Sequence, residues 1–318
     1  MMNTLGLGSV GIASYFWGRS LAPPSPTIPD PLQTPTKTQV GTYNKGGQVG
    51  SFDPSTIRPQ DFFKYGFPGP NHDMGNHNEF ISCYDRSTRN PYWVLEHVTA
   101  DSLKRNEGVD RKKSVFREDE TIPMKFRARL RDYFRSGYDR GHQAPAADAK
   151  FTQEAMNETF LLTNISPQVG EGFNRDYWAF FEDFCRRLAY KYTDVRIMTG
   201  PLYLPKLCDD DKYRVTYEVI GSPPNIAVPT HFFKLVVGEN KGDDTISAAA
   251  FVLPNDKIDN NTPLTAFQVP IEALERSSGL DLLQQVPYLK KKDLCREVKC
   301  EIIVKEYNNQ VNKLLPGK

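Results

Sequence analysis

The sequence has few cysteines for its length. In 318 residues there are five, an odd number, which excludes a disulfide-rich secreted scaffold. They are Cys83, Cys185, Cys208, Cys295 and Cys300. Four residues separate the last two, which is not a zinc-finger spacing. We therefore expect five free thiols, with a local bridge between Cys295 and Cys300 as the alternative.

Net charge of one sign and several common catalytic motifs are also missing. Lys and Arg number 40 and Asp and Glu 39, so an argument for a nucleic-acid partner has to rest on a local patch. The chain has no G-x-S-x-G elbow, no H-E-x-x-H, no paired C-x-x-C and no Walker-type loop. These absences disfavour acyl hydrolases, zinc proteases and P-loop enzymes.

Long hydrophobic runs are absent as well. The first 18 residues carry no charge, but the apolar stretch 5–17 is shorter than the about 20 residues of a membrane span. Six prolines lie between Pro23 and Pro35, and such a stretch cannot form a packed element. We expect a targeting or weak membrane-anchor segment at 1–20, a proline-rich linker at 21–50 and one domain at 51–318.

Short runs of β-branched and aromatic residues dominate that domain. Residues 79–85 and 91–98 flank a polar turn and predict a β-hairpin. Further strands are expected at 159–166, 195–200, 213–221, 230–238, 246–254 and 299–307, and helices at 174–192 and 270–279. Because the helices do not alternate regularly with the strands, the pattern favours an α+β fold with largely antiparallel sheets.

One stretch carries the chemistry. In YDRGHQAPAADAK, residues 138–150, Arg140 and His142 flank Gly141, and a glycine there would let the chain turn tightly. Asn174 and Glu182 follow, eight residues apart, which on a helix places them about 80° apart and toward one side. Taken singly, each has a structural explanation: a loop histidine, a surface arginine, a helix N-cap and a solvated carboxylate. Together they indicate a site.

These residues belong to longer matching motifs. YDRGHQAPAAD, TNISPQ, FNRDYW and VRIMTGPLYLPK resemble the sugar-non-specific DNA/RNA endonucleases with a ββα-metal finger. Within them the chain is most similar to the endonuclease G group of mitochondrial nucleases, especially the fungal members. The resemblance covers roughly residues 61–307.

The resemblance implies a role for each residue. His142 matches the general base, and Arg140 matches the arginine that contacts phosphate. Asn174 matches the single protein ligand of a divalent cation, and Glu182 the carboxylate that holds a water bound to that cation. Arg111 matches a second arginine near the leaving group. We expect a backbone carbonyl of the facing strand to orient the ring of His142.

These residue types suit phosphodiester hydrolysis. A neutral imidazole accepts a proton near neutral pH. Mg²⁺ needs few protein ligands. The guanidinium of one arginine can bind two oxygens of a phosphate at once. Basic residues outnumber acids between Lys104 and Arg140, as backbone binding without sequence preference requires. We expect Mg²⁺ as cofactor, with Mn²⁺ as a substitute.

The resemblance also implies substrates and surroundings. It predicts an endonuclease for single- and double-stranded DNA and RNA that leaves 5′-phosphate and 3′-hydroxyl ends. It predicts a homodimer at the mitochondrial inner membrane or in the intermembrane space, entering the nucleus after release. The uncharged N-terminal stretch adds the expectation of weak membrane association through residues 1–20. The alternatives are a catalytically silent nucleic-acid-binding protein and an exonuclease of the same family.

Overall fold

The computed structural model describes residues 62–65 and 73–304. The expected segments 1–20 and 21–50 lie outside these residues, and the three-part division of the chain stays a prediction. Within the described ranges, no helix is long and apolar enough to cross a membrane.

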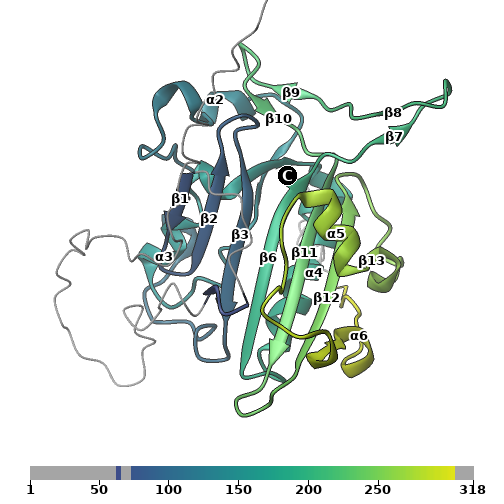
Figure 1. Cartoon of the computed structure of the whole chain (residues 1–318). Helices are drawn as coiled ribbons and strands as arrows, with labels where there is room; N and C mark the ends of the chain where they lie inside the picture. Colours follow the sequence, from purple (N-terminus) through teal and green to yellow (C-terminus); the bar gives the residue numbers. More distant parts are fainter. Residues whose placement is uncertain (1–61, 66–72, 305–318) are drawn as a thin grey trace, which may run out of the picture. The chain divides into compact units, whose positions relative to one another are not determined.

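The main element is a sheet of eight strands. Its order is β1 (Asp73–Asn76), β2 (Phe80–Asp85), β3 (Asn90–Val98), β6 (Asp194–Leu202), β11 (His231–Glu239), β12 (Ile246–Pro254) and β13 (Gln268–Val269). Each of these neighbours pairs antiparallel, and β14 (Lys291–Asp293) pairs parallel with β12. The expected α+β class with largely antiparallel sheets is confirmed (Figure 1).

Both faces of this sheet are covered. In β11, Phe232 and Val236 pack into one core cluster with helix α4 (Tyr177–Leu188). Phe233 and Leu235 pack into a second cluster that contains Leu274 of helix α5 (Ile271–Ser278). Successive side chains of a strand point to opposite faces, so an almost continuous apolar run is needed where both faces are buried. Figure 1 shows α5 on one face of β11 and α4 on the other.

Shorter elements complete the described chain. The helical ones are η2 (Arg111–Lys113), η3 (Met124–Phe126), α2 (Leu130–Tyr133), α3 (Gln153–Glu158), η4 (Leu162–Asn164), η5 (Gly170–Asn174), η6 (Leu264–Phe267), η7 (Tyr288–Lys290) and α6 (Leu294–Glu297). The paired short strands are β4 (Asp139–His142) with β5 (Ile165–Gln168), β7 (Lys206–Leu207) with β8 (Tyr213–Arg214), and β9 (Val219–Ile220) with β10 (Ile226–Ala227).

Three expected strands differ from the structure. The strand expected at 159–166 begins only at Ile165, because the Asn164 side chain bonds the backbone of Ala144 and Thr159 and stabilises the turn η4 instead. The run 213–221 forms only the two-residue strands β8 and β9. Residues 299–304 form no strand: Arg187 donates to the Glu301 carbonyl at 3.0 Å.

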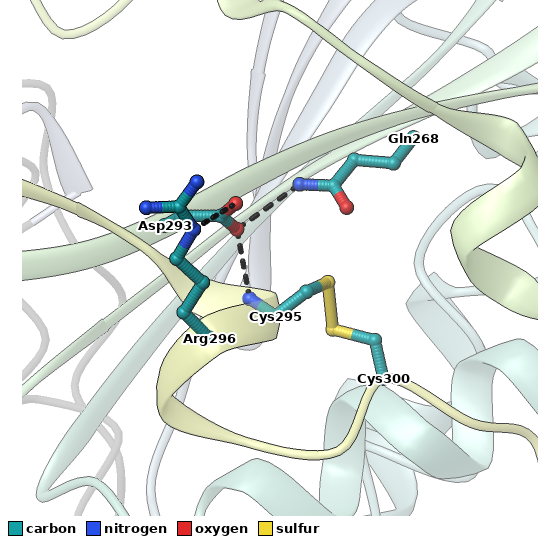
Figure 2. The surroundings of a disulfide bond; sticks show 5 residues. All are labelled: Gln268, Asp293, Cys295, Arg296 and Cys300. Atoms are coloured by element: carbon teal, nitrogen blue, oxygen red, sulfur yellow. Dashed lines mark hydrogen bonds and ion pairs between the residues drawn. A yellow bond between two sulfur atoms is a disulfide. The ribbon is translucent and has the colours of Figure 1, made fainter.

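The expectation of five free thiols is wrong. Cys295 and Cys300 form a disulfide, with their Cα atoms 5.2 Å apart, while Cys83, Cys185 and Cys208 are free. The short helix α6 and the turn after it bring the two residues within the range that a disulfide needs. Figure 2 shows Asp293 beside the bridge, where it accepts hydrogen bonds from the backbone N–H of Cys295 and the side chain of Gln268.

Candidate active site

Two short strands and a helix form the unit that holds the predicted site. Strands β4 and β5 pair antiparallel, with Arg140 opposite Pro167 and His142 opposite Ile165. The chain then passes through the π turn η5, which ends at Asn174, and enters α4, which carries Glu182. Asn174 therefore precedes the helix by three residues, and the expected helical start near Asn174 is wrong.

Gly141 has a different role from the expected tight turn. It lies within β4, so Arg140 and His142, two residues apart, project toward the same face of the strand. A Cβ atom at Gly141 would lie 2.2 Å from Cδ of Gln168, whose side chain is fully buried across the hairpin. The position needs glycine because of this close approach.

The imidazole of His142 is enclosed by aromatic rings. It lies 5.3 Å from the ring of Phe116 and 4.8 Å, edge to face, from the ring of Phe160. Its Nε2 atom is buried and has no hydrogen-bond partner among the described residues. Orientation of the ring by a backbone carbonyl stays a prediction. Burial lowers the pKa of His142 to about 3, and the charges of Arg111 and Arg140 contribute to this shift. The imidazole is therefore neutral at physiological pH.

Asn174 is oriented by Asp139. Its Nδ2 atom donates to Oδ2 of Asp139 at 2.9 Å, and Arg175 donates to both oxygens of the same carboxylate. Burial alone would raise the pKa of Asp139, but the hydrogen bonds from Arg175 and Asn174 outweigh it and lower the pKa. Because an ionised carboxylate only accepts, the amide nitrogen of Asn174 has to face Asp139, which leaves the amide oxygen free for another partner.

Glu182 is half-buried on the first turns of α4. Burial raises its pKa to about 7, against the opposing effect of the positive charges of Lys234 and Arg186. A further cation beside the carboxylate would favour its ionised form.

The two predicted arginines rest on phenylalanine rings. The guanidinium of Arg140 lies 4.3 Å from the ring centre of Phe116, and that of Arg111 lies 5.2 Å from the ring centre of Phe160. A ring face attracts a guanidinium by a cation–π interaction and leaves the N–H groups at the edge of that guanidinium free to bind an anion.

One cavity of about 860 Å³ brings the predicted residues together. Its lining includes His142, Arg140, Asn174, Glu182 and Arg111. Arg175 and Arg186 also line it, but each is paired, with Asp139 and Asp148 respectively. Most of the basic residues between Lys104 and Arg140 are exposed, and of these Arg111, Arg135 and Arg140 reach the cavity.

Sequence reasoning did not identify the aromatic residues of this site. Phe116 and Phe160 contact His142 and hold the arginines, and Phe134 lines the cavity. Phenylalanine is also the ordinary residue of a hydrophobic core, so nothing in the pattern distinguishes these positions. Asp139 had a detectable signal, since it belongs to the same short motif as Arg140 and His142.

The family model for DNA/RNA non-specific endonucleases matches residues 58–289 of this chain. The chain belongs to this family. It is 65% identical over 275 residues to a protein of Saccharomyces cerevisiae named "Mitochondrial nuclease", which covers 85% of this chain and 82% of that protein. It is 42% identical to human "Endonuclease G, mitochondrial", over 68% of this chain and 71% of the human protein.

A solved structure supports the same assignment. The crystal structure titled as the EndoG/EndoGI complex has a TM-score of 0.71 at 46% identity, over 74% of this chain and 97% of that one. The fold is that of a ββα-metal nuclease, and the chain is a nuclease of this family. The resemblance to the endonuclease G group and to its fungal members is confirmed.

The family implies a divalent metal cofactor, and the donor atoms of the site fit one. Among the described residues no group of three or more His, Cys, Asp or Glu could hold a metal. The amide oxygen of Asn174, which Asp139 leaves free, and the carboxylate of Glu182 are hard oxygen donors on one cavity. Such a sparse oxygen set suits a cation that keeps most of its own waters.

Proposed function

We propose that this nuclease hydrolyses the phosphodiester bonds of DNA and RNA, single- and double-stranded, as an endonuclease. His142 is the general base, Arg140 and Arg111 bind the phosphate, and Asn174 holds one Mg²⁺, which Mn²⁺ can replace. Glu182 would hold the same ion through a water. The observation that carries the proposal is that one cavity is lined by a neutral histidine, two oxygen donors and two arginines that have no carboxylate partner among the described residues.

The residues of the chain account for the following steps. Neutral His142 takes a proton from a water molecule as that water attacks the phosphorus atom. The bond from phosphorus to the 3′-oxygen breaks, and the 3′-oxygen gains a proton from solvent. The products are a 5′-phosphate and a 3′-hydroxyl. Arg140 and Arg111 stabilise the charge of the phosphate with their free N–H groups. A bound Mg²⁺ would supply Lewis-acid stabilisation of the same charge.

The low pKa of His142 fits this role in one respect. The base is unprotonated over the whole physiological range, so no fraction of the enzyme is lost to the imidazolium form. The same low pKa makes it a weak base, and Brønsted behaviour then requires a strongly polarised water. Arg140 and Arg111 supply part of that polarisation at the phosphate, and a bound divalent cation would supply more.

The names of the relatives support a location. Proteins named as mitochondrial nucleases are found among its relatives in yeasts, nematode and human. We infer that this chain is also mitochondrial, at the inner membrane or in the intermembrane space, and enters the nucleus after release. We further infer a homodimer, and a weak membrane attachment through residues 1–20.

The test is cleavage of circular DNA and of RNA with Mg²⁺ by His142→Ala and wild type. We expect the variant to lose plasmid nicking by at least about a thousandfold, because water loses its base and its orientation, while DNA binding in a gel-shift assay survives. His231→Ala, a variant of a histidine outside the cavity, is the matched control and should nick normally.

Other outcomes would decide against the proposal. If His142→Ala nicks at the wild-type rate, His142 is not the base. If wild type binds DNA but cuts nothing, the chain is a silent binding protein. If it degrades linear DNA and leaves closed circles intact, it is an exonuclease.

A further inference from the structure

Three arginines that line the cavity share an arrangement. Each has no carboxylate partner among the described residues, and each lies over the ring of a phenylalanine. The pairs are Arg140 over Phe116, Arg111 over Phe160, and Arg135 over Phe134, the last at 5.0 Å. The first two pairs belong to the phosphate site described above. The third has no function there.

The three rings differ in exposure. Phe160 is 3% exposed and Phe116 is half-buried, so packing explains both of them. Phe134 is 73% exposed, although it lines the same cavity. The ring of Phe134 therefore has one face toward Arg135, and most of its surface is open to water at the edge of the cavity.

The turn that presents Phe134 is well held. Phe134 ends α2 and donates its N–H to the carbonyl of Arg131 at 3.2 Å. Ser136 donates both its N–H and its hydroxyl to the carbonyl of Tyr133. Arg135 adopts a left-handed conformation with φ of 56°, which is uncommon for a residue other than glycine. These contacts hold the exposed ring of Phe134 at the cavity.

The chemistry of this pair fits one nucleotide. An aromatic face stacks on a nucleobase of any identity, and a free guanidinium binds the phosphate beside it. A paired base inside a duplex has both faces covered by its neighbours, whereas an unstacked base of a single strand has a face free.

We propose that Phe134 and Arg135 form a base-stacking subsite, in which the ring of Phe134 stacks on an unpaired base next to the scissile phosphate and Arg135 contacts the adjoining phosphate. The subsite gives the enzyme a preference for single-stranded DNA and RNA. This proposal rests on the proposed nuclease function and adds that the active site prefers single-stranded substrates.

The test uses an end-labelled single-stranded DNA that carries one abasic residue at a fixed position. Cutting is measured at every phosphodiester along the strand and compared with the same strand carrying all its bases. In wild type the missing base should lower cutting at the phosphates next to it by about 5- to 150-fold, the range that one base–aromatic stack provides. Distant phosphates in the same lane are the internal reference.

Two substitutions of Phe134 separate stacking from folding. Phe134→Ala should abolish the local decrease and should lower the cutting of intact single strands more than the cutting of duplex DNA. Phe134→Trp should preserve the local decrease, because its ring also stacks. Tyr288→Ala removes an aromatic residue of 80% exposure that does not line the cavity, and it should behave as wild type.

The two proposals fail in different ways. If wild type cuts nothing, the proposed function fails first. If wild type cuts but shows no local decrease, or the decrease persists in Phe134→Ala, the subsite is refuted and the nuclease stands. If Phe134→Ala instead changes only the mass in sedimentation, the exposed ring belongs to an interface between copies.

Discussion

At His142, local packing rather than a hydrogen bond determines the charge of the imidazole. The rings of Phe116 and Phe160 exclude water from it, and two guanidinium groups repel a proton. Both effects act on the folded chain only. In the unfolded chain the same histidine returns to its reference pKa of about 6.5.

This difference predicts a pH-dependent stability. Because the folded pKa of about 3 lies below the unfolded value, the unfolded chain binds the extra proton between those two pH values. The free energy of unfolding should therefore fall as pH falls below about 6.5, by at most about 1.4 kcal/mol per pH unit from this residue. His142→Gln removes the contribution, and urea unfolding with a chelator from pH 7 to pH 4.5 measures it.

In that comparison the two stability curves should converge toward acid. His77, whose pKa burial lowers to about 4, adds a similar decline to both proteins and cancels in the difference. Curves that stay parallel from pH 7 to pH 4.5 would show that His142 is protonated in the folded chain as readily as in the unfolded one.

At the scale of elements, one carboxylate joins the hairpin to the turn before α4. Asp139 lies on β4, and its partners Asn174 and Arg175 lie at the end of η5. The proposed metal ligand is therefore oriented from a different element, across a hydrogen bond of 2.9 Å. Outer partners of this kind typically contribute a factor of 10–100 to metal affinity.

Asp139→Asn tests the hydrogen bond between Asp139 and Asn174. The substituted amide gives Asn174 and Arg175 one acceptor oxygen in place of two, so the Asn174 amide loses its fixed orientation. We expect the Mg²⁺ concentration for half-maximal cleavage to rise by about 10- to 100-fold, with much of the rate recovered at high Mg²⁺. Arg175→Ala is the matched control. It removes the ion pair but keeps the Asn174 bond, and should change the Mg²⁺ requirement less. An unchanged requirement in Asp139→Asn would contradict the role.

The secondary-structure elements also show which parts of the fold could be predicted from the sequence. Strands β3, β6, β11 and β12 were predictable because their apolar runs are long and bounded by turn residues. Helix α5 was predictable because it begins directly after Pro270 and ends directly before Gly279, which has φ of 72°. The strand expected at 159–166 failed because Asn164 bonds distant backbone, which no local pattern records.

The site was predictable for a different reason. His142, Asn174 and Glu182 stand at spacings that matched a known motif, and the structure places them on one cavity. The motif does not reveal which side chains of other elements pack against its residues. Gly141 was expected to make a turn, and only the hairpin shows Gln168 lying across it.

At the scale of the whole described chain, α4 connects the cavity to the last segment. Its first half contributes Glu182 and Phe180 to the cavity, and its second half, with the turn after it, donates to backbone carbonyls of residues 297 and 301. Arg187 donates to the carbonyl of Glu301 at 3.0 Å, and Lys191 donates to that of Glu297. Cys300 and Leu294 belong to the same core cluster as the apolar face of α4.

The Cys295–Cys300 bridge should therefore affect stability and leave catalysis alone. It closes a short loop, for which chain entropy predicts a contribution of about 2 kcal/mol to the free energy of unfolding. The cavity is lined by residues between Arg111 and Arg186, and neither cysteine of the bridge is among them. We expect Cys295→Ser with Cys300→Ser to unfold at lower urea concentration and to cut DNA at the wild-type rate at 25 °C.

A reductant serves as the independent check on that variant. It should destabilise wild type by the same amount and leave the double variant unchanged, because Cys83, Cys185 and Cys208 are already free thiols. A loss of cleavage at temperatures where the reduced protein is still folded would show that the bridge acts through α4 on Glu182. In that case the contacts of Arg187 and Lys191 would carry a displacement of residues 294–304 to the cavity. We do not expect this, because α4 is packed tightly against the sheet and should keep its position.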